Sequence, residues 1–366
     1  MKFSCNYKEI KNIILLIEKI AGKNSSLPIL NTIFFLIKDN KLTLKVTNLE
    51  VGVEFYLTVF DSKNGSICLP AQLIAGVLGT IPPTEIITFE LKDGIVLVDT
   101  FNHHSKIKGF LPDDFPTIPQ VIDGVNFSLP ISLFLLGLKS VVYASATSDI
   151  KPEIASVYLY HDGEYLVFVS TDSFRLAEKK IPLTLINETP SIIIPIKNVN
   201  DISRVIEGAK GEIVIKVDKN QLSLYHSSFL ITSRIIDGVY PDYRQIIPKN
   251  FSTTVLISQL ELTEALKVST IFADKFHHVN LLINPKNKIC EVSAINQDIG
   301  QTTTSINNES NGEEIEVKVN ARYLTESFNS LDAERIELKS SGVNKPLLIS
   351  GVGNKLFKYL VMPVNR

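Results

Sequence analysis

Cysteine and long apolar runs are both scarce in this sequence of 366 residues. Its three cysteines, Cys5, Cys68 and Cys290, stand far apart and are odd in number, which gives neither a disulfide framework nor a set of zinc ligands. The apolar stretch Ile13 to Ile17 is flanked by charged residues and is far shorter than the ~18 residues of a membrane helix. We therefore expect no membrane partner, no secretory signal, and a reducing compartment, the cytoplasm.

A dominant charge of either sign is also missing. The 37 basic residues face 39 acidic ones, so the net charge is −2. No overall positive field would draw the chain to nucleic acid or anionic lipid, and a DNA partner would need a local basic surface. Hydrophobic residues, by contrast, make up 45% of the chain, which is enough for packed cores. This length predicts two or three domains.

The sequence signatures of catalysis and metal binding are absent. There is no Gly-x-x-x-x-Gly-Lys-[Ser/Thr] phosphate loop and no Gly-x-Ser-x-Gly nucleophile elbow. The pairs His103-His104 and His277-His278 would point to opposite faces of a strand, which disfavours a shared metal ion. Asp113-Asp114 precedes Phe115-Pro116 and is typical of a turn. We therefore weigh an enzyme as the less favoured alternative and expect no catalytic residue, metal or cofactor.

Three stretches of alternating apolar residues recur at a spacing of 124 residues, beginning at Ile33, Val157 and Leu281. Each is interrupted by a turn signal, and these signals are Asp39-Asn40, Asp162-Gly163 and the segment 284–287. Alternation broken by turn residues predicts a β-hairpin. Three hairpins at one spacing predict an internal repeat.

Helical patterns accompany each hairpin. One precedes it, at 10–21, 131–146 and 256–272, and a second follows it, starting near Pro70, Pro195 and Asn320. Proline-containing connectors that end at Pro119 and Pro248 separate the repeats. The sequence thus predicts an α+β fold of three repeated domains, 1–119, 120–248 and 249–366, each with two helices packed on about eight antiparallel strands.

Repeats of this kind offer unpaired strand edges to one another, which favours pairing from edge to edge. Three units need not close a circle, but a two-fold dimer would supply six and could close it. The helices would then share one face, and they carry a modest excess of lysine and arginine over acidic residues. An ordinary solvated helix face explains that excess equally well.

Three motifs are specific in combination: Thr171-Asp-Ser-Phe-Arg-Leu176, Asp237-Gly-Val-Tyr-Pro-Asp-Tyr-Arg244 and Tyr359-Leu-Val-Met-Pro363. With them the chain resembles, over its whole length, the bacterial sliding clamp, the β subunit of DNA polymerase III. The resemblance implies a homodimeric, pseudo-sixfold ring that encircles duplex DNA without reading its sequence. It implies a non-catalytic processivity factor of DNA replication, which tethers the polymerase III α subunit, the clamp loader complex, and other DNA polymerases and repair proteins.

The resemblance also implies a hydrophobic pocket for partner peptides between the central and C-terminal domains. Carried over by motif, its residues are Ile154, Thr171, Phe174, Arg175, Leu176, Pro241, Ile246, Pro346, Leu360, Val361, Met362, Pro363 and Val364. From the residues alone, Leu360 to Val364 would be the last strand of a core. Ser173-Phe174 stands where the family often has Gly-His, and Gln245 where some members have arginine, so peptide preference is open.

Two further surfaces follow from the resemblance. The contact between chains would place the edge strand around His103 and Ile107 against Ile271 and Phe272 of the other chain, near Asp274-Lys275-Phe276. The residues facing DNA would be Lys23, Asn24, Lys151, Lys197, Arg204 and Lys210. A monomeric three-domain scaffold that binds peptides without DNA is the second alternative. Molecular mass discriminates it from the ring.

Overall fold

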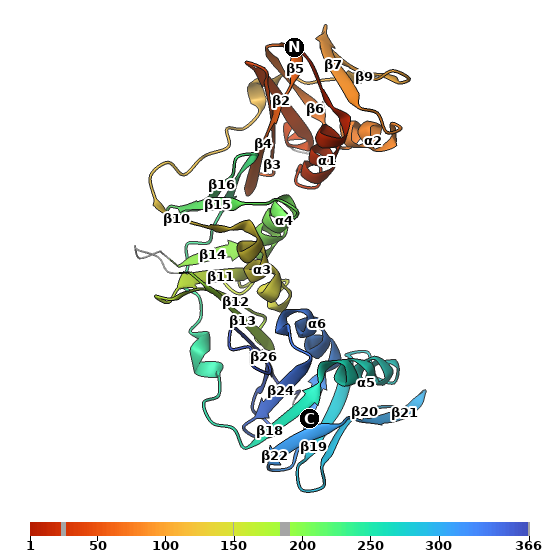
Figure 1. The fold of residues 1–366 in the computed structure, drawn as a ribbon, viewed down its shortest axis with the longest axis vertical. Helices are drawn as coiled ribbons and strands as arrows, with labels where there is room; N and C mark the ends of the chain where they lie inside the picture. The colour runs from red at the N-terminus through yellow and green to blue at the C-terminus, as the bar shows by residue number, and fades with distance from the viewer. Residues whose placement is uncertain (23–26, 149, 184–190, 365–366) are drawn as a thin grey trace. The chain divides into compact units, whose positions relative to one another are not determined.

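The computed structural model describes residues 1–22, 27–148, 150–183 and 191–364 (Figure 1). The chain forms two compact units, Met1–Ser132 with Lys197–Asp237, and Leu133–Ile196 with Gly238–Arg366. The predicted central domain therefore contributes to both units. Lys23 and Asn24, which are predicted to face DNA, lie outside the described residues.

The first unit contains a five-stranded and an eight-stranded sheet. The five-stranded sheet has the order β5 (Phe60–Lys63), β1 (Lys2–Asn6), β7 (Ile86–Lys92), β8 (Ile95–Asp99), β9 (His104–Lys108). The eight-stranded sheet has the order β10 (Val125–Pro130), β15 (Glu212–Val217), β16 (Gln221–Tyr225), β17 (Phe229–Arg234), β4 (Val51–Thr58), β3 (Lys41–Thr47), β2 (Thr32–Lys38), β6 (Gly65–Pro70). Its helices are α1 (Tyr7–Ile17), α2 (Ala71–Thr80) and most of α4 (Ile196–Ile206), with 3-10 turns η1 (Pro28–Asn31) and η2 (Pro112–Asp114).

The second unit contains a nine-stranded and a four-stranded sheet. The nine-stranded sheet has the order β14 (Ile192–Pro195), β11 (Ser156–His161), β12 (Tyr165–Thr171), β13 (Arg175–Pro182), β26 (Phe357–Val361), β25 (Leu347–Gly351), β24 (Arg335–Ser340), β18 (Thr253–Ser258), β22 (Asn308–Gly312). The four-stranded sheet has the order β21 (Gly300–Ser305), β20 (Ile289–Asn296), β19 (His278–Asn284), β23 (Ile315–Asn320). Its helices are most of α3 (Ile131–Val141), α5 (Gln259–Ile271) and α6 (Ala321–Leu331), with 3-10 turns η3 (Val142–Ala144) and η4 (Tyr243–Ile246).

All three predicted hairpins form, as β2–β3, β11–β12 and β19–β20. In the first, Ile37 pairs with Leu42, and the two turn residues Asp39 and Asn40 have φ of 51° and 61°. Two successive positive φ values are those of a type I′ turn, whose twist matches that of the flanking strands, and Asp and Asn tolerate them. The apolar residues that alternate along these strands are buried.

The predicted pairing of repeats through strand edges occurs twice. In the first unit β4 pairs with β17, and in the second β13 pairs with β26. β4 and β13 begin at Val51 and Arg175, which are 124 positions apart and therefore equivalent in the repeat. Each of the two large sheets thus runs continuously from one repeat into the next, which is why the compact units divide the central repeat between them.

The third helical pattern was predicted to start too early. Residues 256–258 belong to β18, which pairs on one side with β24 and on the other with β22. The helix α5 begins at Gln259, and the Ser258 hydroxyl caps it by accepting the N–H of Glu261. The two strand partners of β18 outweigh the apolar periodicity that favoured a longer helix. Similarly, α3 ends at Val141 and continues only as the 3-10 turn η3.

Two absences concern the described part of the chain. None of its helices is long and apolar enough to cross a membrane. No group of three or more His, Cys, Asp or Glu side chains in it is arranged to hold a metal ion.

Candidate partner-peptide groove

The turn from Thr171 to Arg175 joins β12 to β13 and is held by its own side chains. Asp172 Oδ1 accepts the backbone N–H groups of Phe174 and Arg175, each at 2.9 Å. The Thr171 hydroxyl accepts the N–H of Ser173 at 3.1 Å and donates to the carbonyl of Arg175 at 2.6 Å. Ser173 has φ of 76°, in the left-handed region. This turn presents the Phe174 side chain to solvent, where 61% of it is exposed.

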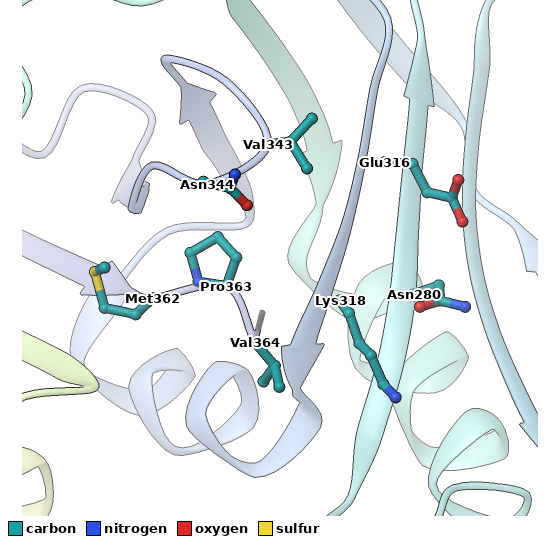
Figure 2. Close-up of a pocket in the computed structure, with 8 residues that line it drawn as sticks. All are labelled: Asn280, Glu316, Lys318, Val343, Asn344, Met362, Pro363 and Val364. Atoms are coloured by element: carbon teal, nitrogen blue, oxygen red, sulfur yellow. The ribbon is translucent and has the colours of Figure 1, made fainter. Parts of the chain in front are cut away.

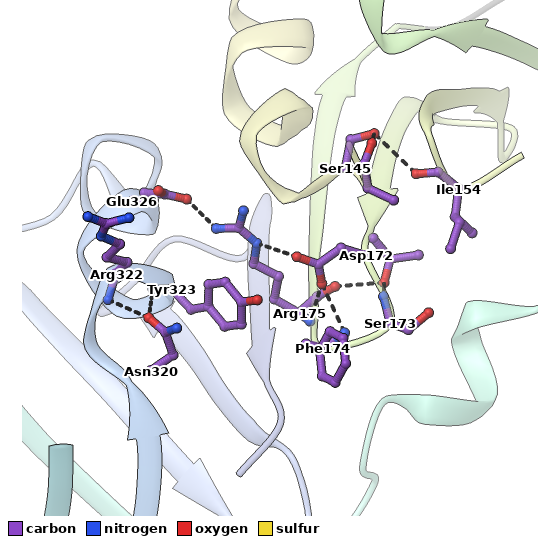
Figure 3. Close-up of polar contacts among 12 residues, drawn as sticks. Ser145, Ile154, Asp172, Ser173, Phe174, Arg175, Asn320, Arg322, Tyr323 and Glu326 are labelled. Carbon is purple, nitrogen blue, oxygen red and sulfur yellow. Dashed lines mark hydrogen bonds and ion pairs between the residues drawn. The ribbon is translucent and has the colours of Figure 1, made fainter. Parts of the chain in front are cut away.

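Arg175 links this turn to helix α6 (Figure 3). Its Nε donates to Asp172 Oδ2 at 2.9 Å, and its Nη1 pairs with Glu326 Oε2. The guanidinium carbon lies 4.4 Å from the centroid of the Tyr323 ring, a cation–π arrangement. Burial would lower the pKa of Arg175, but Glu326 and the other groups around it raise that pKa overall. Arg175 is thus a permanent cation with a side chain only 10% exposed.

The C-terminal segment after β26 lies between this turn and β23. The N–H of Met362 donates to the carbonyl of Phe174 at 2.8 Å, and the N–H of Val364 donates to the carbonyl of Lys318 at 2.7 Å. These two bonds hold residues 362–364 in an extended path across the second unit. A strand end held on both sides is a rigid wall for a groove.

A groove of about 680 Å³ opens beside this wall. It is lined by Phe174, Arg175, Lys275, Phe276, His277, His278, Asn320, Arg322, Tyr323, Glu326, Met362, Pro363 and Val364. Its lining combines aromatic, methionine and proline side chains with cationic ones. Apolar surface with a few fixed polar groups is typical of sites that receive a short peptide.

Five of the predicted pocket residues line this groove, namely Phe174, Arg175, Met362, Pro363 and Val364. Leu176, Leu360 and Val361 do not, because β13 and β26 lie inside the nine-stranded sheet and these side chains are buried in its core. Pro346 is buried as well. Residues 360–361 are therefore buried strand residues, whereas residues 362–364 line the groove.

Four other predicted pocket residues stand outside the lining. The Thr171 hydroxyl donates to the carbonyl of Arg175, within the same turn. Ile154 is half-buried, and Pro241 and Ile246 are exposed. The connector that carries Pro241 is held in place by contacts of its tyrosine side chains.

Those tyrosines explain the Tyr-Pro-Asp-Tyr motif. The ring of Tyr240 stacks on that of Tyr158 with centroids 4.6 Å apart. The hydroxyl of Tyr243 donates to Glu178 Oε2 at 2.6 Å and lies 2.7 Å from the hydroxyl of Tyr160. Burial, followed by the neighbouring Glu178 carboxylate, raises the pKa of Tyr243 strongly, so it remains a donor. The motif anchors the connector to the sheet face of β11 and β13.

One side of the groove, formed by the loop 275–278 and the start of α6, is not among the pocket residues predicted from the sequence. Lys275 and Phe276, predicted to lie near the contact between chains, line this groove. The loop is tied to α6, because the N–H of Ala321 donates to the carbonyl of His277 at 2.9 Å and Asn320 Nδ2 donates to that of Phe276 at 3.1 Å. The sequence feature that could have indicated this side of the groove is Asn320, because asparagine is a preferred residue at the start of a helix and this helix start lies next to the loop.

A second pocket of about 650 Å³ adjoins the same C-terminal segment (Figure 2). Met362, Pro363 and Val364 belong to both pockets. The remaining lining of the second pocket is mostly polar and comprises Asn280, Glu316, Lys318, Val343 and Asn344. Residues 362–364 therefore present two faces, of which the one toward Phe174 is the more apolar.

The residues predicted for the contact between chains differ in accessibility. Ile271, at the end of α5, is 68% exposed. Phe272 is half-buried, and His103 is half-buried with Nε2 2.7 Å from the Ser105 hydroxyl. Ile107 is only 2% exposed because its side chain points into the core of its own sheet. The part that Ile107 plays in a contact between chains stays a prediction, and its strand β9 lies at a sheet edge.

The described residues predicted to face DNA are on the surface. Lys151, Lys197 and Lys210 are exposed. Arg204 is half-buried, and its Nη1 lies 2.7 Å from Asp201 Oδ1, so part of its charge is compensated within α4. Any phosphate contact by Arg204 would compete with this ion pair.

Comparisons with known proteins agree on one family. Family models described as the N-terminal, central and C-terminal domains of the DNA polymerase III beta subunit match residues 1–119, 129–242 and 244–365.

Two curated relatives show the same likeness. A beta sliding clamp of Synechococcus elongatus is 26% identical, over 100% of this chain and 99% of its own. One of Vibrio cholerae is 24% identical, over 100% of both chains.

Solved structures share the fold. The beta subunit of DNA polymerase III from Thermotoga maritima has a TM-score of 0.94 at 24% identity, covering 100% of this chain and 99% of that one. The beta subunit from Pseudomonas aeruginosa has a TM-score of 0.93 at 22% identity, with both chains fully covered. The three domain matches span nearly the whole sequence, and the chain therefore belongs to the DNA polymerase III beta subunit family, the non-catalytic sliding clamps that act as processivity factors in DNA replication.

Proposed function

We propose that the groove beside residues 362–364 receives short peptides of the replicative polymerase α subunit, the clamp loader complex and other DNA polymerases and repair proteins, and so tethers them to DNA. The observation that carries this proposal is the wall formed by Met362, Pro363 and Val364 opposite Phe174. Both sides are fixed by backbone hydrogen bonds, so little ordering is needed when a peptide binds. The working compartment is the cytoplasm.

The ring itself follows from the repeat. The three domains are 1–119, 120–248 and 249–366, and two junctions between them use equivalent strands, β17 with β4 and β26 with β13. In the first repeat the strand equivalent to β17 is β9, and in the third repeat the strand equivalent to β4 is β21. Both are edge strands. Pairing β9 of one chain with β21 of another closes two chains into a ring of six domains.

Lys151, Lys197, Arg204 and Lys210, with Lys23 and Asn24, would contact the phosphates of the enclosed duplex. Because the ring holds DNA by encircling it, each contact can be weak, and weak contacts permit sliding. A clamp loaded on closed circular DNA should therefore leave when the circle is cut. A protein held by adhesion would stay.

Met362→Ala tests the groove assignment. Met362 is half-buried and lines the groove. Truncation should reduce peptide affinity and polymerase stimulation at least about tenfold, because it removes an apolar side chain from the wall opposite Phe174. The Met362→Ala protein should still form the dimer. Leu176→Ala is the informative contrast, because Leu176 is buried and its loss should lower the unfolding midpoint as well. Unchanged peptide affinity of Met362→Ala in a titration would refute the assignment.

A further inference from the structure

The groove carries an excess of positive charge that its own neighbours do not neutralise. Among the described residues that line it, Glu326 is the only carboxylate, and it pairs with Arg175. Lys275 and Arg322 also line it, and neither forms an ion pair with a described residue. Both are exposed. This local excess stands out in a chain whose net charge is −2.

The two cations come from segments that are held together. Lys275 belongs to the loop before β19, and Arg322 to the first turn of α6. The bonds of Ala321 to the His277 carbonyl and of Asn320 to the Phe276 carbonyl fix that loop against the helix. Asp274, the carboxylate next to Lys275, is engaged by His278, whose Nδ1 lies 2.8 Å from Asp274 Oδ2. It is therefore committed to the imidazole beside it.

The cations stand beside aromatic surface. The Lys275 ammonium lies 5.1 Å from the centroid of the Phe276 ring, and Phe276 and Phe174 are both exposed and line the groove. A short peptide segment bound in the groove would thus contact both aromatic rings and positive charges. The adjoining second pocket differs, because Lys318 there is matched by Glu316 and little aromatic surface is present.

We infer that Lys275 and Arg322 form a specificity subsite that selects partner peptides carrying acidic residues next to an aromatic anchor. This inference rests on the proposed function of the groove and names the peptide chemistry that it prefers. The ring of the anchor packs against Phe174, Phe276 and Met362. The flanking carboxylate receives charge-assisted hydrogen bonds from Lys275 and Arg322.

The experiment measures fluorescence anisotropy of three labelled nonapeptides that share one phenylalanine anchor and differ only in two flanking residues, Glu-Glu, Gln-Gln or Lys-Lys. At about 50 mM salt the Glu-Glu peptide should bind about fivefold more tightly than Gln-Gln, and Lys-Lys should bind most weakly. At about 500 mM salt the difference should shrink below twofold. Lys275→Gln combined with Arg322→Gln should reduce the preference for Glu-Glu over Gln-Gln to below about twofold at the lower salt concentration.

The matched control is Lys286→Gln combined with Lys355→Gln, which makes the same charge change at exposed positions outside the groove. It should keep the preference. The inference alone is wrong if the Glu-Glu and Gln-Gln peptides bind equally tightly. It is also wrong if the control variant loses the preference for Glu-Glu to the same extent as the Lys275 and Arg322 variant. Failure of every peptide to bind overturns the groove assignment and the inference with it. If a single-stranded oligonucleotide loses affinity in the Lys275 and Arg322 variant while the acidic peptide does not, the charge serves nucleic acid and the inference is wrong.

Discussion

Ser173 adopts a backbone conformation that a serine does not favour, in the turn that presents Phe174 to the groove. Its φ of 76° is unfavourable for any side chain with a Cβ, and glycine adopts it freely. The conformation persists because Thr171 and Asp172 bind three backbone N–H groups of the same turn. The turn therefore stores a small strain in order to present Phe174.

Ser173→Gly should stabilise the protein by about 0.5–1 kcal/mol. Relief of the left-handed conformation, about 1–2 kcal/mol, exceeds the extra chain entropy that glycine loses on folding, about 0.5–1 kcal/mol. Urea unfolding measures the change. The control is Ser227→Gly, at an exposed turn serine outside the left-handed region, which should lower stability. A lower midpoint for Ser173→Gly would show that the turn is unstrained.

The three cysteines should be inert in the folded protein. All are buried, and burial raises the pKa of Cys5 to about 12, that of Cys68 to about 11 and that of Cys290 to about 12. A raised pKa leaves almost no thiolate at pH 8, and the thiolate is the reactive form. A thiol reagent at pH 8 should label none of them in the native protein and all three in denaturant. Rapid native labelling of any one would contradict their burial.

At the scale of elements, helix α3 is positioned by close packing on its sheet. A Cβ at Gly137 would lie 2.4 Å from Cε2 of Phe168 on β12, which is closer than two carbon atoms can approach. Phe134, one turn earlier, has its ring centroid 5.9 Å from that of Phe168. Glycine at 137 thus lets the helix backbone approach the aromatic ring directly, and any larger residue must push the helix away.

Gly137→Ala should therefore destabilise the protein by about 1–3 kcal/mol, the usual cost of overpacking a core. Gly76→Ala in α2 is the matched control, since nothing lies within 4 Å of its Cβ position. That substitution should stabilise by up to about 1 kcal/mol through helix propensity. Thermal unfolding distinguishes the two. A neutral Gly137→Ala would mean that the Phe168 ring moves aside freely and that α3 is not held by this contact.

The hairpins and the groove differ in how far the sequence could predict them. Each hairpin is local: alternation and turn residues lie within about 15 positions, and the structure confirms all three. The groove is not local, because Arg175 and Arg322 are brought together only through the pairing of β13 with β26 and through Glu326. For Ile107, a single apolar residue on a short strand does not reveal which face is buried.

At the scale of the whole molecule, closure depends on surfaces that a single chain leaves open. The edges of β9 and β21 carry unpaired backbone groups, and Ile271 adds an exposed apolar side chain at the end of α5, which packs on β21. A second chain would cover both. The ring dimer should therefore be sensitive to charge at Ile271 and insensitive to charge elsewhere on α5.

Ile271→Asp should shift the protein from a dimer, near twice 40.7 kDa, toward a 40.7 kDa monomer in light scattering. A buried, unpaired carboxylate at the contact is the reason. Leu260→Asp on the same helix is the matched control, since Leu260 is 66% exposed and Ile271 is 68% exposed. It should remain dimeric. A dimer that survives Ile271→Asp would place the contact elsewhere, and a monomeric wild-type protein would refute the ring.

The repeat, the hairpins and the family could be predicted from the amino-acid sequence, because they depend on residue spacing and on short motifs read along the chain. Which motif residues face solvent became visible only in the folded chain. Folding buries Leu176, Leu360 and Val361 inside a sheet, leaves Met362 to Val364 as a wall, and brings Lys275 and Arg322 to the groove opposite them. The physical reason is that exposure and charge balance are properties of side chains from distant segments packed together, which no single segment carries.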